Sequence, residues 1–237
     1  MTPVSQDEIA ERRAAALLSI AQAAEKSGRS PGDIALLAVT KGQPAEVVRR
    51  AARAGLLLFG ENRVAEAAEK IQAVRGEFPH LTWKLIGPLQ TNKAALALQC
   101  FAMVESVDRQ RLAERLERLL EGSPSRLPVL LEVNLAAEPT KAGARPEEAP
   151  ALARAIETLP HLACRGLMAV PPFDPDPDLA RPWFRQLRQL RDRIAESLGR
   201  ELPEISAGMS HDFAVAVEEG STEVRLGTAL FGPREAA

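Results

Sequence analysis

The stretch LLAVTKGQP, residues 36–44, shows the pattern that decides the fold of this chain: an apolar run that ends abruptly on polar residues and is followed by a helix-like segment. The apolar run, residues 34–39, is apolar on both faces, and the helix-like segment PAEVVRRAARAG begins at Pro44, which is compatible with a first helical turn. Gly55 stands where that helix would stop. We interpret the stretch as one strand–helix unit in which Lys41 follows a strand built for burial.

The same unit recurs along the chain of 237 residues. The expected strands are short, apolar on both faces and free of internal proline, which is typical of a parallel sheet covered by helices. Eight units in about 240 residues are the size of a (β/α)8 barrel, so the predicted fold class is α/β, a single TIM-type barrel with an extra N-terminal helix. A doubly wound open sheet is the competing architecture, and it would need an edge pair. The expected strands cover residues 34–39, 56–60, 83–87, 101–106, 128–135, 162–170, 204–208 and 223–227.

Composition and charge place the chain among soluble globular proteins. Hydrophobic residues make up 46% of the sequence and charged residues 26%, and the net charge of −2 predicts no general attraction to nucleic acid or to membranes. The sequence has no apolar run of roughly 18 residues, and its amphipathic first segment carries acids, unlike a signal peptide. Cys100 and Cys164 form no CxxC pair, so neither a metal site nor a disulfide framework is expected. We expect one cytoplasmic domain over residues 1–237.

Glycines and polar residues gather at the points where the expected strands end. In barrels of this type the functional groups lie at the carboxyl ends of the strands. Glycine and asparagine are common in any turn, but seven loops of the same character favour a ligand site. The residues at these points are Lys41, Gly60-Glu61-Asn62, IGPLQTNK (86–93), Asn134, GLMAVPP (166–172), SAGMSHD (206–212) and VRLGTALFG (224–232).

The last two of these loops indicate a phosphate site. Phosphate sites in such barrels often form after strands seven and eight, from backbone N–H groups and a helix start. Here the first loop supplies a glycine, a hydroxyl and an expected helix start at Ser210. The second supplies Gly227 and Thr228, with Arg225 two residues before the glycine. Glycine lets the backbone approach an anion closely, and hydroxyl groups add donors.

Lys41 indicates what else the ligand carries. A lysine that leaves a buried strand for a closed site is partly desolvated, which disfavours its charged form, and a neutral amine condenses with aldehydes to form a Schiff base. The alternative is a lysine that ends the strand and reaches solvent. A phosphate pocket with an inward lysine is typical of a site for a phosphorylated aldehyde or ketone. That ligand is pyridoxal 5′-phosphate (PLP), or a sugar phosphate as in Schiff-base aldolases.

Six stretches occur in this order along the chain: LLAVTKGQP, FGENRVAEAAEK, WKLIGPLQTNK, VNLAAEPTKAG, RGLMAVPP and SAGMSHDFAVAVEEGSTEVRLGTALFG. Together they resemble the pyridoxal-phosphate homeostasis protein family, single-domain barrels similar to the N-terminal domain of alanine racemase. The resemblance spans residues 34–232. It implies a protein that binds PLP and contributes to intracellular PLP homeostasis.

The resemblance assigns roles to matching positions. Lys41 matches the lysine that holds the cofactor as an internal aldimine. Ser210, with the backbone near Met209, matches a group that binds the cofactor's phosphate. Gly227 and Thr228 match phosphate-binding groups as well.

Two further positions match residues near the cofactor ring. Arg225 matches an arginine that we place at the pyridine nitrogen, with the phosphate edge as second choice; at the nitrogen it would leave the ring unprotonated and a poorer electron sink. Asn62 matches a polar residue near the ring. Lys93 and Lys141 lie in loops that fit the family pattern, either as ordinary solvated lysines or as secondary amines that receive the cofactor. Gly42 stands where threonine is common, a departure that would loosen the loop after the lysine.

The resemblance also bears on whether the protein is an enzyme. A racemase of this barrel type needs a tyrosine as second base and a second β domain that covers the site, but this chain has no tyrosine and only a few residues after the eighth strand. We therefore expect a PLP carrier or regulator, a monomer that holds the cofactor on Lys41 and passes it to apo PLP-dependent enzymes. The alternative is a PLP-dependent enzyme of low activity, similar to an amino-acid racemase.

Overall fold

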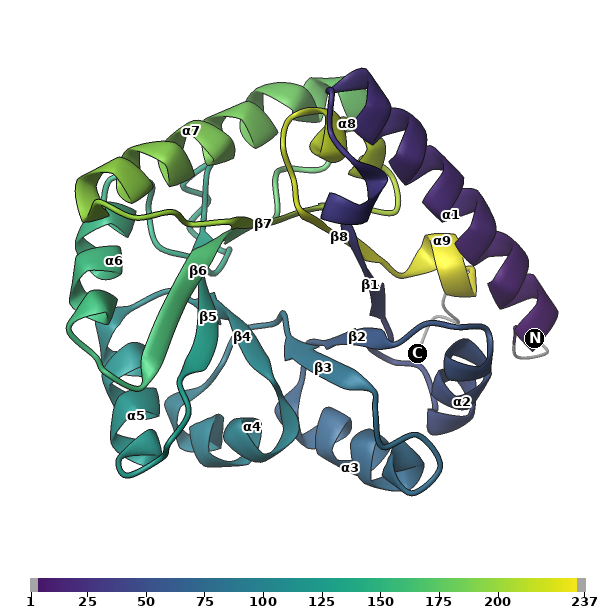
Figure 1. Ribbon diagram of the computed structural model, residues 1–237, viewed down its shortest axis with the longest axis horizontal. Coiled ribbons are helices and arrows are strands. Elements are labelled where there is room, and N and C mark those ends of the chain that lie inside the picture. Colours follow the sequence, from purple (N-terminus) through teal and green to yellow (C-terminus); the bar gives the residue numbers. More distant parts are fainter. Residues whose placement is uncertain (1–3, 234–237) are drawn as a thin grey trace.

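Eight parallel strands, in the order of the sequence, close into a barrel in the computed structural model, which describes residues 4–233 (Figure 1). β1 pairs with β2 on one side and with β8 on the other, so the sheet closes on itself. The predicted TIM-type barrel is therefore confirmed, and the open sheet is excluded. The strands are β1 (Ala35–Val39), β2 (Leu58–Glu61), β3 (Thr82–Leu85), β4 (Met103–Val107), β5 (Leu127–Val133), β6 (Leu162–Ala169), β7 (Glu204–Met209) and β8 (Glu223–Leu226).

Helices surround the barrel on its outside and connect consecutive strands (Figure 1). The expected helix start at Ser210 is wrong: the helix after β7 begins at Phe213, because the chain first makes a turn in which Asp212 accepts a hydrogen bond from the Met209 N–H. The helices are α1 (Gln6–Lys26), α2 (Ala45–Arg53), α3 (Val64–Arg75), α4 (Ala94–Cys100), α5 (Gln110–Leu120), α6 (Ala149–Glu157), α7 (Arg181–Leu198), α8 (Phe213–Glu218) and α9 (Thr228–Phe231).

The N-terminal helix α1 covers the gap that a regular barrel closes with a helix after its last strand. Within the described chain β8 is followed by α9, which has only 4 residues, and α1 packs against α8, α9 and α2 (Figure 1). Ser5 starts α1 through a capping box with Glu8. The extra helix expected from the sequence is thus confirmed; residues 1–3 and 234–237 of the expected domain lie outside the described residues.

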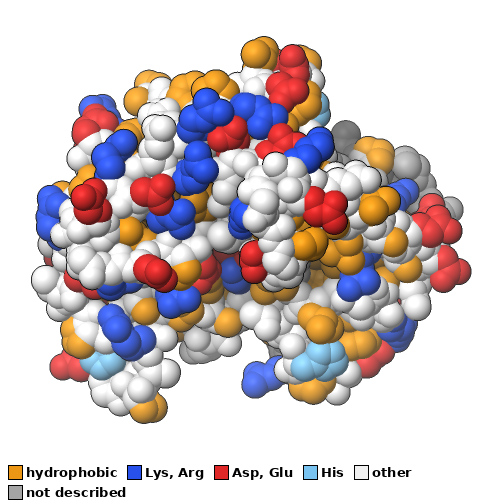
Figure 2. Space-filling view, turned by 45° about the horizontal axis from the view of Figure 1, so that its top comes forward, with side chains coloured by type: hydrophobic (Ala, Val, Ile, Leu, Met, Phe, Trp, Pro, Cys, Tyr) orange, Lys and Arg blue, Asp and Glu red, His pale blue; other side chains and the backbone are white. Residues whose placement is uncertain are grey.

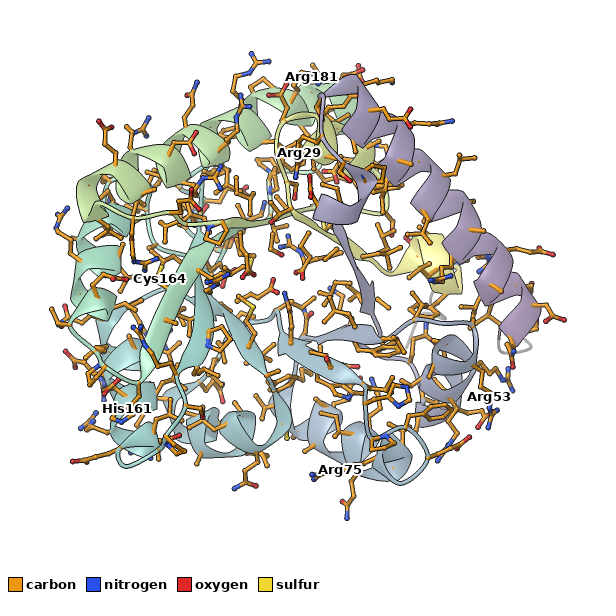
Figure 3. All side chains as sticks on the ribbon, in the orientation of Figure 1. Arg29, Arg53, Arg75, His161, Cys164 and Arg181 are labelled. Carbon is orange, nitrogen blue, oxygen red and sulfur yellow. The ribbon has the colours of Figure 1, made fainter. Side chains whose placement is uncertain are left out.

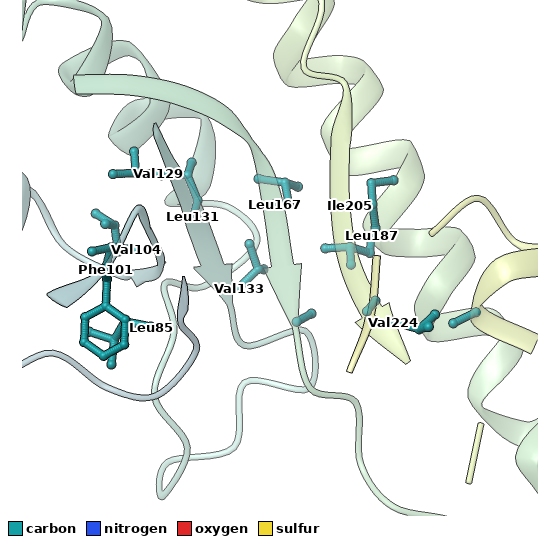
Figure 4. Close-up of a cluster of buried hydrophobic side chains, with 14 of the residues drawn as sticks. Leu85, Phe101, Val104, Val129, Leu131, Val133, Leu167, Leu187, Ile205 and Val224 are labelled. Atoms are coloured by element: carbon teal, nitrogen blue, oxygen red, sulfur yellow. The ribbon is translucent and has the colours of Figure 1, made fainter. Parts of the chain in front are cut away.

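The main hydrophobic core lies between the barrel and its helices. Alternate residues of each strand point outward into this layer, as Val129, Leu131 and Val133 do on β5. Ala and Leu side chains of the helices pack against them, which is why the helix segments read as amphipathic. Figure 4 shows part of this layer, with Leu85, Phe101, Val104, Val129, Leu131, Val133, Leu167, Leu187, Ile205 and Val224 labelled.

The barrel interior is a second and more polar compartment. Met103, Leu130 and Met168 form a small apolar cluster separate from the main core. Beside it, Lys84 of β3 forms an ion pair with Glu223 of β8. Because β1 and β2 lie between these two strands in the sheet, their side chains can meet only across the interior. Interiors of such barrels are usually filled by branched apolar side chains. The charged side chains in this interior are therefore candidates for a functional role.

The outer surface carries both signs of charge. Figure 2 shows Lys and Arg side chains interspersed with Asp and Glu side chains on one face. This mixture agrees with the net charge of −2. Within residues 4–233, no helix combines the length and the apolar character that crossing a bilayer requires.

Candidate functional site

Lys41 lies two residues after the end of β1, in a pocket shared with the loop that follows β8. β1 and β8 are paired, with Ala38 beside Leu226, so the residues that follow the two strands meet at one rim of the barrel. This brings Lys41 together with Gly227 and Thr228, as the sequence predicts. The pocket is lined by Val39, Lys41, Gln43, Gly227, Thr228, Phe231 and Gly232.

The loop after β7 reaches the same rim through Ser210. The Ser210 hydroxyl oxygen accepts hydrogen bonds from the backbone N–H groups of Gly227 (3.2 Å) and Ala229 (3.1 Å). Backbone N–H groups that converge on one oxygen are the arrangement that binds an oxyanion. The structure therefore brings Ser210 into the same cluster as Gly227 and Thr228.

The turn between β7 and α8 holds Met209 in a different way. The Met209 N–H donates to Oδ1 of Asp212 (2.7 Å), and the Asp212 N–H donates to the Met209 carbonyl oxygen (3.1 Å). The amide of Met209 is thus engaged inside the turn. Its contribution to the cluster is to shape the loop that carries Ser210.

Arg225 lies inside the barrel, with 4% of its surface exposed. Its Nη1 donates to the carbonyl oxygen (2.8 Å) and hydroxyl oxygen (2.9 Å) of Ser206, and its Nη2 donates to the carbonyl oxygen of Ala169 (2.7 Å). Burial lowers the pKa of the guanidinium, and the carboxylates of Glu105 and Glu223 oppose that shift. An arginine side chain keeps its proton in proteins, and this one is held by Ala169, the last residue of β6, and by Ser206 of β7.

Arg225 is connected through Ser206 to a network of buried charges. The Ser206 hydroxyl donates to Oε1 of Glu223 (3.1 Å), whose Oε2 lies 2.5 Å from Nζ of Lys84. Glu105 Oε1 lies 3.2 Å from the same Nζ. Burial alone would lower the pKa of Lys84, but the two carboxylates raise it. Burial raises the pKa of Glu223, and the charge of Glu105 raises it further.

Four buried polar atoms near the carboxyl ends of the strands have no hydrogen-bond partner within residues 4–233: Glu61 Oε2, Asn62 Oδ1, Ser106 Oγ and Glu132 Oε2. Burial, with the charge of Asp108, raises the pKa of Glu132 to about 7, against the opposing charge of Arg225. Buried polar atoms without partners are rare in native proteins. Their presence at this end of the barrel fits a site that takes a polar ligand.

Lys93 and Lys141 do not line the pocket that contains Lys41, and neither does His161. Lys93 is exposed just before α4, and Lys141, in the loop after β5, forms an ion pair with Glu138 (2.6 Å). His161 precedes β6 at the other end of the barrel, on the outer edge of the view in Figure 3, and pairs with Glu117 (2.6 Å). In the described part of the chain, no group of three or more His, Cys, Asp or Glu residues could hold a metal ion.

The sequence reasoning missed the interior charges. Their signal is a single charged residue inside an otherwise apolar strand, as in TWKLI (82–86), MVESV (103–107) and VLLEV (129–133). A charge at such a position must point into the barrel or into the helix layer, and both are costly without a partner. That cost makes each of these residues a candidate for function or for a buried pair.

Comparison with known proteins gives a consistent set of similarities. The alanine racemase N-terminal domain family matches residues 19–235. The pyridoxal phosphate homeostasis protein of Pseudomonas aeruginosa is 44% identical over 230 residues, 96% of each chain. The protein of the same name from Aquifex aeolicus is 40% identical over 225 residues, 95% of this chain and 98% of its own. The structure of PipY from Synechococcus elongatus with PLP bound has a TM-score of 0.83 and 36% identity, and it covers 94% of this chain and 100% of PipY.

Proposed function

This chain belongs to the family of pyridoxal phosphate homeostasis proteins, and we propose that it binds PLP at the carboxyl ends of β1 and β8 and holds it by a Schiff base with Lys41. The observation that carries the proposal is the pocket that contains Lys41 together with Gly227 and Thr228. When bound, PLP supplies an aldehyde carbon that forms a C=N bond to a primary amine with loss of one water molecule. Lys41 supplies that amine, and it must lose its proton to act as the nucleophile.

The phosphate group fits the cluster formed by the last two loops. The N–H groups of Gly227 and Ala229 both donate to the Ser210 hydroxyl oxygen, which leaves the proton of that hydroxyl, together with the Thr228 hydroxyl, to donate to a phosphate oxygen. These groups are neutral, so they bind an anion through hydrogen bonds and leave the amine of Lys41 as the site's reactive group. Met209 acts by shaping the turn that presents Ser210.

Arg225 and Asn62 suit the ring of the cofactor. We place the guanidinium of Arg225 at the pyridine nitrogen, with the phosphate edge as second position, and Asn62 beside the ring. Ser206 and Ala169 fix Arg225 through three hydrogen bonds. An arginine held in this way cannot give up its proton, so it would keep the ring nitrogen unprotonated and disfavour carbanion chemistry.

These residues suit a carrier better than a racemase. The sequence contains no tyrosine to act as second base. Arg225 at the ring nitrogen would also disfavour the carbanion chemistry that racemisation requires. We propose a monomeric, cytoplasmic protein in which one barrel domain limits free PLP and delivers it to apo PLP-dependent enzymes.

The test is mass spectrometry of the protein after incubation with PLP and reduction with borohydride, which converts the C=N bond into a stable amine. The expected result is a single pyridoxyl group on Lys41 in the wild type and none at that position in Lys41→Ala. Lys93→Ala and Lys141→Ala serve as controls and should keep the label. Labelling of Lys93 or Lys141 with none on Lys41 would overturn the proposal.

A further inference from the structure

The backbone on both sides of Lys41 is held by charged side chains from β2 and α3. Before it, the Thr40 hydroxyl donates to Oε1 of Glu61 (2.6 Å), and the Thr40 carbonyl oxygen accepts from Nζ of Lys70 (2.7 Å). After it, the Gly42 N–H donates to Oε1 of Glu66 (2.7 Å). The residue in the middle is the one whose amine must reach the cofactor.

The three charged residues are bonded to one another. Nζ of Lys70 lies 2.5 Å from Oε1 of Glu61 and 3.3 Å from Oε1 of Glu66. One ammonium therefore bridges two carboxylates and a main-chain carbonyl, which ties the groups on the two sides of Lys41 into one unit. We call Glu61, Glu66 and Lys70 the Lys41 clamp.

The clamp lies largely away from water. The side chains of Glu61 and Lys70 are 0% and 4% exposed, and that of Glu66 is 32% exposed. Burial raises the pKa of Glu61, although the charge of Lys70 and the hydrogen bonds from Lys70 and Thr40 oppose it. Burial acts in the same direction on Glu66, but the Gly42 N–H and the charge of Lys70 outweigh it and lower its pKa.

The stability of the fold does not by itself explain why these buried charges are present. A buried ion pair costs both charges their hydration, and apolar residues of similar size often stabilise a fold as well or better. Charged side chains add geometric constraint instead, because each hydrogen bond fixes the position of a particular backbone atom. Here those atoms flank Lys41, and Gly42 has a φ of +72°, so the chain turns sharply after the lysine.

We propose that Glu61, Glu66 and Lys70 are positioning residues for Lys41: they fix the chain on both sides so that its amine points at the cofactor's aldehyde. The proposal rests on the proposed function, because it assigns the clamp a role in covalent capture by Lys41. The proposal also explains how the loop can remain ordered at Gly42, where the sequence alone predicts a looser loop. The charged contact of Glu66 with the Gly42 N–H restores the order that glycine would remove.

The test compares two ligands that differ at one carbon. PLP can bind covalently, whereas pyridoxine 5′-phosphate has an alcohol in place of the aldehyde and reports only the pocket. Two variants are used: Glu66→Ala, at the partly exposed end of the clamp, and the double variant Glu61→Gln/Lys70→Met, which keeps the volumes but leaves no buried charge unpaired. The rate of covalent capture of PLP is measured from the visible absorption of the linkage. We expect this rate to fall about ten- to a hundredfold in both variants. The affinity for pyridoxine 5′-phosphate should stay unchanged.

A second comparison separates positioning from general damage. In a Lys41→Ala background, Glu66→Ala should change PLP binding no further, because the residue it acts through is gone. Glu117→Ala, which removes the partner of His161 at the other end of the barrel, controls for loss of stability and should leave capture by Lys41 at the wild-type rate.

The outcomes separate the two proposals. Failure of wild-type protein to link PLP to Lys41 would overturn the proposed function and the clamp with it. A wild-type protein that links PLP, with clamp variants that capture it equally fast, would overturn the clamp alone. An equal loss of affinity for both ligands would also overturn it, because the residues would then support only the pocket.

Discussion

Glu132 is a single residue whose protonation makes the stability of the fold depend on pH. Its side chain is 8% exposed, and its pKa is raised to about 7 from the usual 4.5, first by burial and then by Asp108. Below pH 4.5 the carboxyl is protonated in both the folded and the unfolded chain. As the pH rises from 4.5 to 7, the unfolded chain ionises first, so Glu132 makes unfolding easier across this window.

We predict that Glu132→Gln removes this penalty, because the amide mimics the neutral acid. Near pH 5 the variant and the wild type should have similar free energies of unfolding; at pH 8 the variant should be more stable by up to about 3 kcal/mol. Urea unfolding of the ligand-free protein at both pH values measures the difference. Glu121→Gln, at an exposed position, should show no such pH-dependent gain. A Glu132→Gln protein that is less stable than wild type at pH 8 would show that the carboxylate is needed in its ionised form.

Individual site residues differ in how well the sequence predicts them. Lys41, Ser210, Gly227 and Thr228 stand at strand ends, where the barrel rule places function, and the structure gathers them at one rim. The partners of Arg225 could not be predicted in this way. They depend on which residues of the neighbouring strands β7 and β6 lie within reach of Arg225 on β8, and that information lies in the register of the sheet rather than in local sequence.

At the scale of elements, strands were easier to predict than the loops between them. Each expected strand overlaps an observed one, because a fully buried parallel strand needs a continuous apolar run. The start of α8 was harder. Ser210 and Asp212 are both good helix-capping residues, and the choice of Phe213 as the first helical residue depends on the hydrogen bonds that Asp212 makes with Met209.

Gly208, in β7 just before that loop, sets the direction in which the chain leaves the strand. Its φ is +94°, and a Cβ at this position would lie 2.6 Å from the Cβ of Ala216 and 2.9 Å from the Cα of Phe213. We predict that Gly208→Ala destabilises the protein by about 2–4 kcal/mol, through backbone strain and crowding against α8. It should also weaken pyridoxine 5′-phosphate binding, because Ser210 moves with the loop.

The matched control is Gly76→Ala at the end of α3. Gly76 has a φ of −65°, and a Cβ there would meet no atom within 4 Å. This change should be neutral or stabilise the protein by about 0.4–1 kcal/mol. Chemical unfolding and ligand titration of the two variants check both expectations. If Gly208→Ala binds the ligand as tightly as Gly76→Ala does, the turn has no part in holding the phosphate.

On the scale of the whole molecule, α1 decides whether the barrel is completely covered. The buried face of α1 includes Ile9 and Ile20. Arg12 Nη1 of α1 donates to the Leu230 carbonyl oxygen of α9 (3.4 Å), and Arg50 Nη1 of α2 donates to the carbonyl oxygen of Val4, just before α1 (2.9 Å). The first segment of the chain thus packs beside the last helices, α8 and α9. We infer that α1 is part of the same cooperative unit as the barrel rather than an appendage.

Ile20→Ala tests this inference. Ile20 is 1% exposed, so its truncation should lower the free energy of unfolding by about 2–5 kcal/mol, whereas Leu18→Ala, at a side chain that is 61% exposed, should change it by less than about 0.5 kcal/mol. The readouts are circular dichroism and the fluorescence of the two tryptophans, Trp83 in β3 and Trp183 in α7, neither of which lies in α1. If α1 completes the barrel, both signals shift to the same lower midpoint, because loss of the helix exposes the core that β8 and β1 share with it. A fluorescence midpoint left at the wild-type value, with only a small early loss of helical signal, would mean that the eight strands are stable without α1.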